Sequence, residues 1–556
     1  MKREGAMKVM RMKGERFYRL VVLAMVALLV LAGCAQPSTG GEEAGSSVQT
    51  NPPTSNAGEE TSEPSVEGGE PLEGGVLVIG HDSGPEFLDP HKAVTFQDYN
   101  IAEQLYESLL RFSKTMTIEP ALAESYKQLD DKTYEFTLRQ GVKFHDGTPL
   151  TTEDVVYSFE RILDPQTASP AGPKFSAIQN VESVDERTVR FTLKEPFAPF
   201  LSYLASPENS AIVSKAFTEA HGNDLSTVAN GTSAFKLAQF SPGEVIRLTK
   251  NEDYWIEGLP YLDGVEFRIM QDESSRIAAM RSGDIHMTWF PPDKRQLLER
   301  LENVSISDNA PTRVALFILN NQRPPLDNVN VRRAISLSLD RQAIIDTVLG
   351  GRGRVSMRIP PGQAPYGYQG DGSDLPYHQR DVEEARRLLA EAGYTNGIAL
   401  DIEVIGIQAL ALETRAAELI KQQAAEAGIT FNIKQMEYGS ALKNYGSLNY
   451  ETELFGLTWE PDPDSYIFTS FHSSSPVSSV KDSQLDEMIE AARAELNVNE
   501  RIKMYQEIER YIADQAYMLF PYSNELRVEV WSDSVRDYTS MPNSRRIYLQ
   551  EVWLGE

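Results

Sequence analysis

The sequence predicts an α/β fold divided between two or three lobes. Strand-like runs in which apolar and polar residues alternate are followed repeatedly by segments whose apolar residues recur with the 3.6-residue period of a helix. No period of about 20–50 residues repeats, so a solenoid or a propeller is not expected. About 480 residues follow a polar N-terminal region, which is more than one hydrophobic core usually organises. Several lobes are therefore expected.

The first 33 residues have the pattern of a secretory signal peptide. Residues 1–19 contain seven lysines and arginines and two glutamates, and residues 20–33 form an unbroken apolar run. As a helix, this run of about 14 residues rises about 21 Å, which is short of the roughly 30 Å hydrocarbon core of a bilayer. A basic start followed by a short apolar run is typical of an exported chain rather than of a permanent membrane span.

Cys34 directly follows the apolar run. The segment Leu31-Ala32-Gly33-Cys34 resembles the lipobox of bacterial lipoproteins, in which small residues precede the cleavage site and the thiol receives a diacylglyceryl group. Cys34 is also the only cysteine, which excludes disulfides, cysteine metal sites and a cysteine nucleophile from the body of the protein. We expect an extracytoplasmic protein, held to the periplasmic or cell-surface side of the cell membrane by lipid on Cys34.

Residues 34–73 are expected to be a disordered linker behind that anchor. They lack aromatic residues and are rich in Ser, Thr, Gly, Pro and Glu, so they cannot bury enough apolar surface to offset the entropy of ordering. The formal net charge of the chain is −28, and it falls to about −33 once residues 1–33 are removed. Such a surface repels nucleic acid and anionic lipid, so neither is expected as a partner.

Order begins at residues 74–80, a short apolar run bounded by glycines that is typical of a buried strand. A helix is expected over 98–111, with Ile101, Leu105, Leu109 and Leu110 on one face. Asp146-Gly147 predicts a tight turn, and a helix begins at Thr152. Further strands are expected at 134–139, 188–193, 245–249 and 265–270, and further helices at 331–349, 382–392, 412–427 and 500–513.

The sequence contains none of the common catalytic or nucleotide-binding motifs. HExxH, GxSxG and GxxxxGK[ST] are all absent, so the chain is not expected to be an ATPase. Its seven histidines are scattered and none pairs at helical spacing, so we expect no direct metal site and no cofactor. His145 and Asp146 are interpreted as turn residues, and Arg332 and Arg333 as members of solvated or structural ion pairs.

Several segments, taken in order, resemble the family 5 extracellular solute-binding proteins of ABC importers, which include dipeptide, oligopeptide and nickel receptors. The resemblance spans about residues 75 to 540. It rests on these segments: 87–91 (FLDPH), 106–109 (YESL), 119–126 (EPALAESY), 134–150 (YEFTLRQGVKFHDGTPL), 152–159 (TEDVVYSF), 251–255 (NEDYW), 283–285 (GDI), Asn320 with Asp327, 331–341 (VRRAISLSLDR) and 462–466 (DPDSY).

The resemblance implies a type II (class C) periplasmic-binding-protein fold, with two large lobes and an extra subdomain around a ligand cleft. Lobe I would comprise 74–95, 231–315 and 521–556, lobe II, the extra subdomain, 96–230, and lobe III 316–520. Crossing connections between the large lobes would form a hinge, and closure would bury the ligand. A monomer is expected.

The loop from Gly456 to Tyr466 is the first candidate for contact with a ligand. In the peptide receptors of the family, an acidic residue of this loop pairs with the α-ammonium group of the peptide. Here Leu457 replaces the usual tryptophan, and Glu460 is the nearest match to that acidic position. The candidates in this loop are Trp459, Glu460, Asp462 and Asp464. Alternatively, Pro461 and Pro463 make the segment no more than a rigid turn.

Two further candidate regions lie closer to the N-terminus. In the family, the extended segment before Leu88 lines the cleft and offers backbone groups to a peptide in the manner of an added strand. Here that segment is Ser83, Gly84, Pro85, Glu86 and Phe87. Trp289 is a candidate aromatic wall, with ordinary core or surface packing as the alternative. Tyr106 is a candidate to face the cleft, with helix packing as the alternative.

We therefore expect a lipid-anchored receptor that captures a peptide-like solute and delivers it to the membrane subunits of an ABC permease, without catalysis. Receptors of the same class that bind an oligosaccharide or a metal chelate remain open. An anchored peptide or glycan hydrolase, with Glu460 and Asp462 as its carboxylate pair, is the alternative from a different class. A role in signalling cannot be separated from transport at the level of sequence.

Overall fold

The computed structural model describes residues 70–556 except 364, 406–410, 459–461, 542–545 and 556. Within these residues the strands form three larger sheets and two short ribbons, so the chain has the α/β fold that its sequence predicts. None of the helices described is long and apolar enough to cross a membrane. Cys34 and the predicted linker lie outside the described residues.

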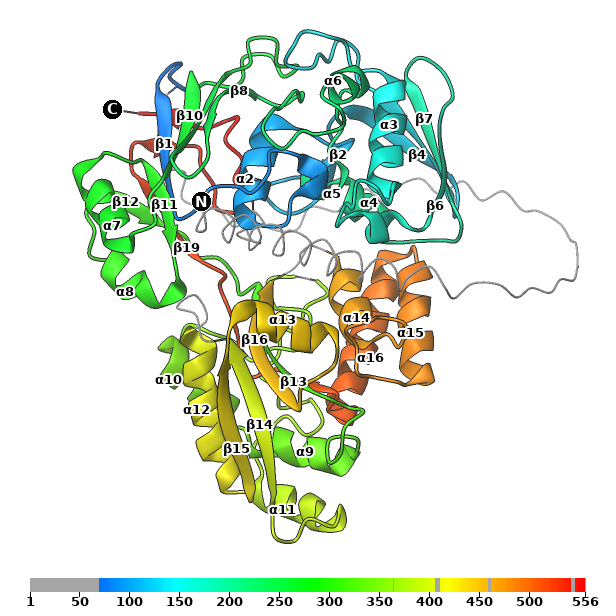
Figure 1. Cartoon of the computed structure of the whole chain (residues 1–556), viewed down its shortest axis with the longest axis vertical. Coiled ribbons are helices and arrows are strands. Elements are labelled where there is room, and N and C mark those ends of the chain that lie inside the picture. The colour runs from blue at the N-terminus through cyan, green and yellow to red at the C-terminus, as the bar shows by residue number, and fades with distance from the viewer. Residues whose placement is uncertain (1–69, 364, 406–410, 459–461, 542–545, 556) are drawn as a thin grey trace, which may run out of the picture. The chain divides into compact units, whose positions relative to one another are not determined.

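The first sheet has seven strands and draws on both ends of the described chain. In Figure 1, β1 (blue), β11 (green) and β19 (red) lie side by side in this sheet. β1 pairs in parallel with β10 and β11, and the remaining pairs are antiparallel. In sheet order the strands are β12 (Val304–Ile306), β19 (Val528–Ser532), β11 (Met287–Phe290), β1 (Val76–His81), β10 (Gly264–Ile269), β9 (Val245–Lys250) and β8 (Phe235–Ser241).

The second sheet has four antiparallel strands, in the order β4 (Ala123–Asp130), β5 (Thr133–Leu138), β7 (Thr188–Leu193) and β6 (Ile178–Ser183). β5 and β7 alternate between buried and half-buried residues along their length, because one face of the sheet packs on a core. Aromatic rings fill that core, and Phe136, Phe159 and Phe191 meet edge to face at centroid distances of 4.8 and 5.4 Å.

The third sheet has six strands, in the order β15 (Ile429–Met436), β14 (Ile398–Ile405), β16 (Thr452–Thr458), β13 (Arg313–Leu319) and β17 (Met518–Leu519), with β18 (Ser523–Asn524) also paired to β13. Every residue of β13 is buried, as expected of a strand covered on both faces. β13 begins inside the 231–315 range expected for lobe I, and β18 lies inside the 521–556 range. The lobe boundaries at 315 and 521 stay predictions.

Helices cover these sheets, and Figure 1 shows α12 lying along β14 and β15. The described α-helices are α2 (Phe96–Leu105), α3 (Thr152–Leu163), α4 (Phe200–Leu204), α5 (Pro207–Ser210), α6 (Lys215–Ala220), α7 (Glu273–Ser282), α8 (Arg295–Leu298), α9 (Val329–Ser338), α10 (Arg341–Leu349), α11 (Val382–Glu391), α12 (Ala411–Ala425), α13 (Tyr438–Gly446), α14 (Pro463–Phe471), α15 (Ser483–Ala494) and α16 (Val498–Gln515). The short ribbons are β2 (Leu110–Phe112) with β3 (Ile118–Pro120), and β20 (Val535–Arg536) with β21 (Trp553–Leu554).

The helix predicted over 98–111 is wrong in its second half. α2 ends at Leu105 because Tyr106 has an extended backbone, with φ −127° and ψ 155°. The carbonyl groups of Glu107 and Leu109 then accept hydrogen bonds from Ile212, Ala121 and Ala123, and 110–112 form β2. These donors lie well beyond the reach of a helical hydrogen bond along the chain, so tertiary contacts replace the helical pattern.

The single helix predicted over 331–349 is two helices, α9 and α10. Leu339 adopts an extended backbone, with φ −89° and ψ 127°, and this breaks the helical ladder. The side chain of Asp340 then accepts a hydrogen bond from the backbone N–H of Ala343 at 2.9 Å and caps the start of α10.

Two chain segments, 307–312 and 525–527, connect the first sheet to the third. The carboxylate of Glu525 accepts two hydrogen bonds from the guanidinium of Arg295, at 3.0 and 2.7 Å. The backbone N–H of Ser307 donates to the carbonyl of Glu529, and the N–H of Glu529 donates to Oγ of Ser307, both at 2.9 Å. Ser307 is therefore bound to β19, and Glu525 to Arg295, next to the first sheet.

Candidate functional site

The extended segment after β1 is held from within the protein. The carboxylate of Asp98, on α2, accepts hydrogen bonds from the backbone N–H groups of Glu86 at 2.7 Å and Phe87 at 3.4 Å. Those two backbone groups are therefore already used. Ser83 and Glu86 are exposed, whereas Gly84, Pro85 and Phe87 are half-buried. Of the predicted segment, the backbone at 83–84 is the part without such an internal hydrogen bond among the described residues.

The start of this segment is fixed by Asp82. Its Oδ1 accepts a hydrogen bond from Nε2 of Gln97 at 3.0 Å and lies 3.2 Å from Nδ1 of His81. Burial alone raises the pKa of Asp82, but the contacts with His81 and Gln97 outweigh it and the pKa lies below its ordinary value. Asp82 thus stays a carboxylate beside the exposed Ser83.

Trp289 lies within β11 and is only 5% exposed. Its ring meets His81 edge to face at 4.3 Å, and the guanidinium of Arg527 lies 4.3 Å from the ring centroid. Burial lowers the pKa of His81. Tyr106 is completely buried in the same core, at the end of α2. Both aromatic candidates therefore pack in the core of the first sheet, and contact of either with a ligand stays a prediction.

Asp462 caps the N-terminus of α14 and is buried. Its two oxygens accept hydrogen bonds from Nη2 and Nη1 of Arg501, on α16, at 2.7 and 2.9 Å, and Oδ1 also accepts the backbone N–H of Asp464 at 2.9 Å. A carboxylate bound in this bidentate way has little capacity left for a ligand. Asp462 therefore fixes the entry into α14.

Asp464, two residues further on, lies where two predicted lobes touch. It is buried, Oδ1 lies 2.8 Å from Nε of Arg493, and Oδ2 accepts a hydrogen bond from the hydroxyl of Tyr203 at 3.4 Å. Burial raises the pKa of Asp464 to about 6, although Arg493 acts against that rise. Tyr203 belongs to α4, within the range expected for lobe II, whereas Asp464 and Arg493 belong to the range expected for lobe III.

Arg493 makes the other contacts at this junction. Its guanidinium lies 3.9 Å from the ring centroid of Phe468 and 5.2 Å from that of Phe197. Its backbone carbonyl accepts a hydrogen bond from the N–H of Ala198 at 2.8 Å. We call this group the Arg493 junction, and it consists of Phe197, Ala198, Tyr203, Asp464, Phe468 and Arg493. It links segments that are more than 250 residues apart.

The structure thus brings together only part of the predicted site. Asp462 and Asp464 lie on one helix end, Trp289 and Tyr106 lie in the core of the first sheet, and Trp459 and Glu460 lie outside the described residues. Sequence reasoning did not identify Arg493, Arg501 or Tyr203, because no local motif marks them. The described residues contain no group of three or more His, Cys, Asp or Glu side chains able to hold a metal ion.

The other motifs have structural roles, although the partners of Arg332 differ from those predicted. Ring nitrogens of His145 lie 3.0 Å from the carbonyl of Ser233 and 3.3 Å from the N–H of Gly231. Asp146 accepts hydrogen bonds from Asn230 and Thr148. Arg333 pairs with Asp514, as predicted. Arg332 instead donates to the backbone carbonyls of Leu326 and Gln515 and forms no ion pair among the described residues, so the ion pair predicted for it is wrong.

Comparison with known proteins gives consistent matches. Residues 117–478 match the family model described as "Bacterial extracellular solute-binding proteins, family 5 Middle". The chain is 29% identical to Di/tripeptide-binding protein 2 of Pseudomonas aeruginosa, over 84% of this chain and 93% of that protein. It is also 29% identical to Heme-binding protein A of Haemophilus influenzae, over 93% of this chain and 95% of that protein. Among solved structures, the periplasmic binding protein DppA of Helicobacter pylori in complex with the peptide STSA is 27% identical, with a TM-score of 0.72 over 87% of this chain and 99% of that one.

Proposed function

Because the chain belongs to the family 5 bacterial extracellular solute-binding proteins, we propose that it is a lipid-anchored receptor that captures a peptide and delivers it to the permease of an ABC transporter. Proteins of this family bind solutes outside the cytoplasm and are not enzymes. The observation that carries the peptide proposal is the shared fold, at 27% identity, with a binding protein solved with a bound tetrapeptide. The similarity to a di/tripeptide-binding protein supports the same ligand class.

The arginine partners of the loop acids support Glu460 as the residue that binds the peptide ammonium. Asp462 is engaged by Arg501 and Asp464 by Arg493, so neither carboxylate is available as the counter-charge for an incoming ammonium group. Glu460 is the remaining acid of the loop in the sequence, and it lies outside the described residues. A peptide ammonium would therefore pair with Glu460, while backbone groups near Ser83 and Gly84 would hold the peptide main chain.

The engagement of Asp462 also counts against hydrolysis. A glycan or peptide hydrolase with Glu460 and Asp462 as its carboxylate pair needs both groups to face the substrate. Both oxygens of Asp462 instead accept hydrogen bonds from Arg501, and Oδ1 also accepts one from the backbone of α14.

A thermal-shift screen tests the ligand class. A ligand present at about 100 times its dissociation constant adds about 2.7 kcal/mol to the free energy of unfolding, which is readily measured. We expect di- to tetrapeptides to raise the melting temperature, and oligosaccharides and heme to leave it unchanged. Stabilisation by heme alone would instead favour a metal-chelate receptor, in line with the heme-binding relative.

The lipid anchor is tested separately. Replacement of Cys34 with Ser removes the thiol that would receive the lipid, so the protein should move from the membrane fraction to the soluble fraction while peptide binding stays unchanged. A linker of residues 35–73 would reach about 30–40 Å as a flexible chain, which is enough for the body to meet a membrane protein. If the Cys34→Ser protein still sediments with membranes, another part of the chain anchors it.

A further inference from the structure

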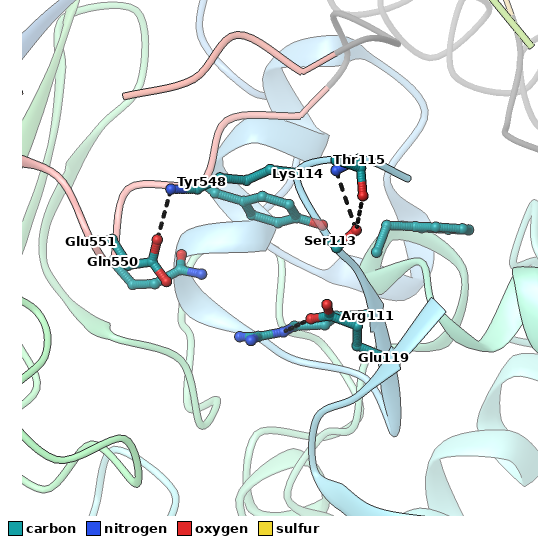
Figure 2. A pocket seen from close by; sticks show the side chains of 9 residues that line it. Arg111, Ser113, Lys114, Thr115, Glu119, Tyr548, Gln550 and Glu551 are labelled. Atoms are coloured by element: carbon teal, nitrogen blue, oxygen red, sulfur yellow. Dashed lines mark hydrogen bonds and ion pairs between the residues drawn. The ribbon is translucent and has the colours of Figure 1, made fainter. Parts of the chain in front are cut away.

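A pocket lies away from the Arg493 junction, between the β2–β3 hairpin and the C-terminal segment 548–551 (Figure 2). Its volume is about 370 Å³, within the range of small-molecule sites. One wall is formed by the hairpin and its turn, and the other by a segment more than 400 residues away in the sequence. The lining residues that matter here are Arg111, Ser113, Glu119, Tyr548, Gln550 and Glu551.

Both walls are fixed by contacts behind them. In the hairpin turn, Oγ of Ser113 accepts the backbone N–H groups of Thr115 at 3.2 Å and Thr117 at 3.1 Å. Behind the second wall, the backbone N–H of Ile547 donates to Glu103 at 3.1 Å, and its carbonyl accepts from Gln104 at 2.8 Å. A pocket with such rigid walls needs little ordering when a ligand enters.

The pocket carries paired charges of both signs. Arg111 and Glu119 are directly opposite each other in the hairpin, and Nε of Arg111 lies 3.5 Å from the carboxylate. Nζ of Lys114 lies 2.7 Å from Glu551 and joins the two walls. All four side chains are 32–45% exposed. Figure 2 shows these two ion pairs together with Tyr548 and Gln550.

Two of the polar groups in the pocket make no hydrogen bond in the described part of the chain. The ion pair of Arg111 uses Nε, and its terminal nitrogens Nη1 and Nη2 make no hydrogen bond there. The side-chain amide of Gln550 makes none either. A guanidinium with two such nitrogens matches a carboxylate in the bidentate geometry that gives strong recognition.

The net charge of −28 restricts the ligand. A body this acidic repels free anions over long distances, whereas a molecule that is neutral overall feels no such repulsion. A zwitterion meets this condition and also presents one group of each sign to the pocket. Its carboxylate complements Arg111, and its ammonium complements Oε1 of Glu551, since Lys114 contacts the other oxygen, Oε2.

We propose that this pocket is a second binding site, for a zwitterion of amino-acid size, in which Arg111 and Gln550 bind the carboxylate and Glu551 binds the ammonium. Tyr548 lines the pocket with them. The site is separate from the solute site proposed above, and it does not depend on the peptide proposal.

Calorimetric titration of the purified full-length chain with L-serine tests this site. We expect saturable binding of L-serine, and binding at least tenfold weaker for N-acetyl-L-serine and for L-serine methyl ester, because each lacks one of the two charges. Addition of a saturating tetrapeptide should leave the affinity for L-serine unchanged. No saturable binding of L-serine, or equal binding of all three compounds, overturns the proposal.

Variants locate the binding. Arg111→Gln and Gln550→Ala should each weaken L-serine binding, the first at least tenfold, without changing the melting temperature by more than a few degrees. Arg352→Gln is the matched control, because Arg352 forms an exposed ion pair with Glu299 at 2.7 Å outside the pocket. If Arg111→Gln folds poorly, Gln550→Ala still tests whether L-serine binds in this pocket. Unchanged affinity in both pocket variants places L-serine elsewhere and contradicts the proposal.

Discussion

Asp462 and Asp464 lie two residues apart at the start of α14, but their side chains belong to different regions of the molecule. Asp462 faces Arg501 on α16, within one predicted lobe, and makes two short hydrogen bonds to it. Asp464 faces the junction with α4, where it is shared between Arg493 and the hydroxyl of Tyr203 at 3.4 Å. Both acids are buried.

The difference between these two regions concerns what each contact stabilises. A bidentate pair between two helices of one lobe is present whenever that lobe is folded. The Arg493 junction exists only where the 96–230 segment meets the 316–520 segment, so it also depends on how these segments are arranged. We therefore expect changes at Asp462 to affect folding, and changes at Arg493 to affect solute binding.

The largest effect is expected for Asp462→Ala. This change leaves the guanidinium of Arg501 buried without a counter-charge and removes the cap of α14. Loss of one partner of a buried ion pair costs about 3–5 kcal/mol of the free energy of unfolding, measured by denaturant titration. Glu299→Gln, which breaks the exposed pair with Arg352, is the control and should cost no more than about 1 kcal/mol. Equal losses of unfolding free energy in the two variants would show that the buried Asp462 pair contributes no more to stability than an exposed pair.

The second effect is a pH dependence that comes from Asp464. Its pKa is about 6 in the folded protein and has the ordinary value of 3.8 when unfolded, so the protonated form is favoured by folding. The resulting stability is fully present below about pH 4 and is lost as the pH rises through about 6. Its size is at most about 3 kcal/mol. The charged or titratable groups around it are Arg493, Asp462, Arg501, Tyr203 and Tyr505.

Asp464→Asn isolates this contribution. The unfolding free energy of the native chain, measured relative to that of the variant, should fall between pH 4 and pH 7. A difference that stays constant or rises over this range would mean that Arg493 holds Asp464 ionised in the folded protein.

A smaller effect is expected for Arg493→Ala, and it should appear in binding. The change removes the ring contacts with Phe197 and Phe468 and the pair with Asp464. If the solute binds the arrangement in which the junction is formed, its affinity should fall about tenfold, which corresponds to about 1.4 kcal/mol. Calorimetric titration with the peptide found in the thermal-shift screen measures this. Unchanged affinity together with reduced stability would place the junction among purely structural contacts.

The smallest effect is expected for Tyr203→Phe, which deletes only the hydroxyl at the same junction. A hydrogen bond of 3.4 Å is weak, so the peptide affinity should change less than about threefold. A larger loss would mean that this hydroxyl, rather than Arg493, dominates the junction.

The sequence predicts much of the fold where the signal is local. The alternating pattern at 188–193 is β7 with the same bounds, and the predicted start of a helix at Thr152 is the start of α3. The prediction from sequence fails where residues outside the local segment form hydrogen bonds with its backbone. Nothing within 106–111 indicates that Ile212 donates to Glu107 or that Leu110 pairs with β3.

The candidate site shows the same contrast between local sequence signals and contacts with distant residues. Asp462 and Asp464, each preceded by a proline, stand out in the sequence, but their roles depend on Arg501 and Arg493, which lie on α16 and α15. Partner choice between buried charges is decided by tertiary packing, and no spacing rule encodes it. Trp289 likewise stands out as an aromatic candidate, yet His81 and Arg527 enclose its ring.

The central claim is that the chain is a peptide receptor that pairs the free ammonium group of its ligand with Glu460. Calorimetric titration with a tetrapeptide and with its N-acetylated form tests this claim most directly, in the native chain and in Glu460→Gln. We expect the tetrapeptide to bind the native chain at least tenfold more tightly than the acetylated form, and Glu460→Gln to remove most of that preference. Equal binding of the two forms by the native chain, or failure of the native chain to bind the unmodified tetrapeptide, would contradict the account.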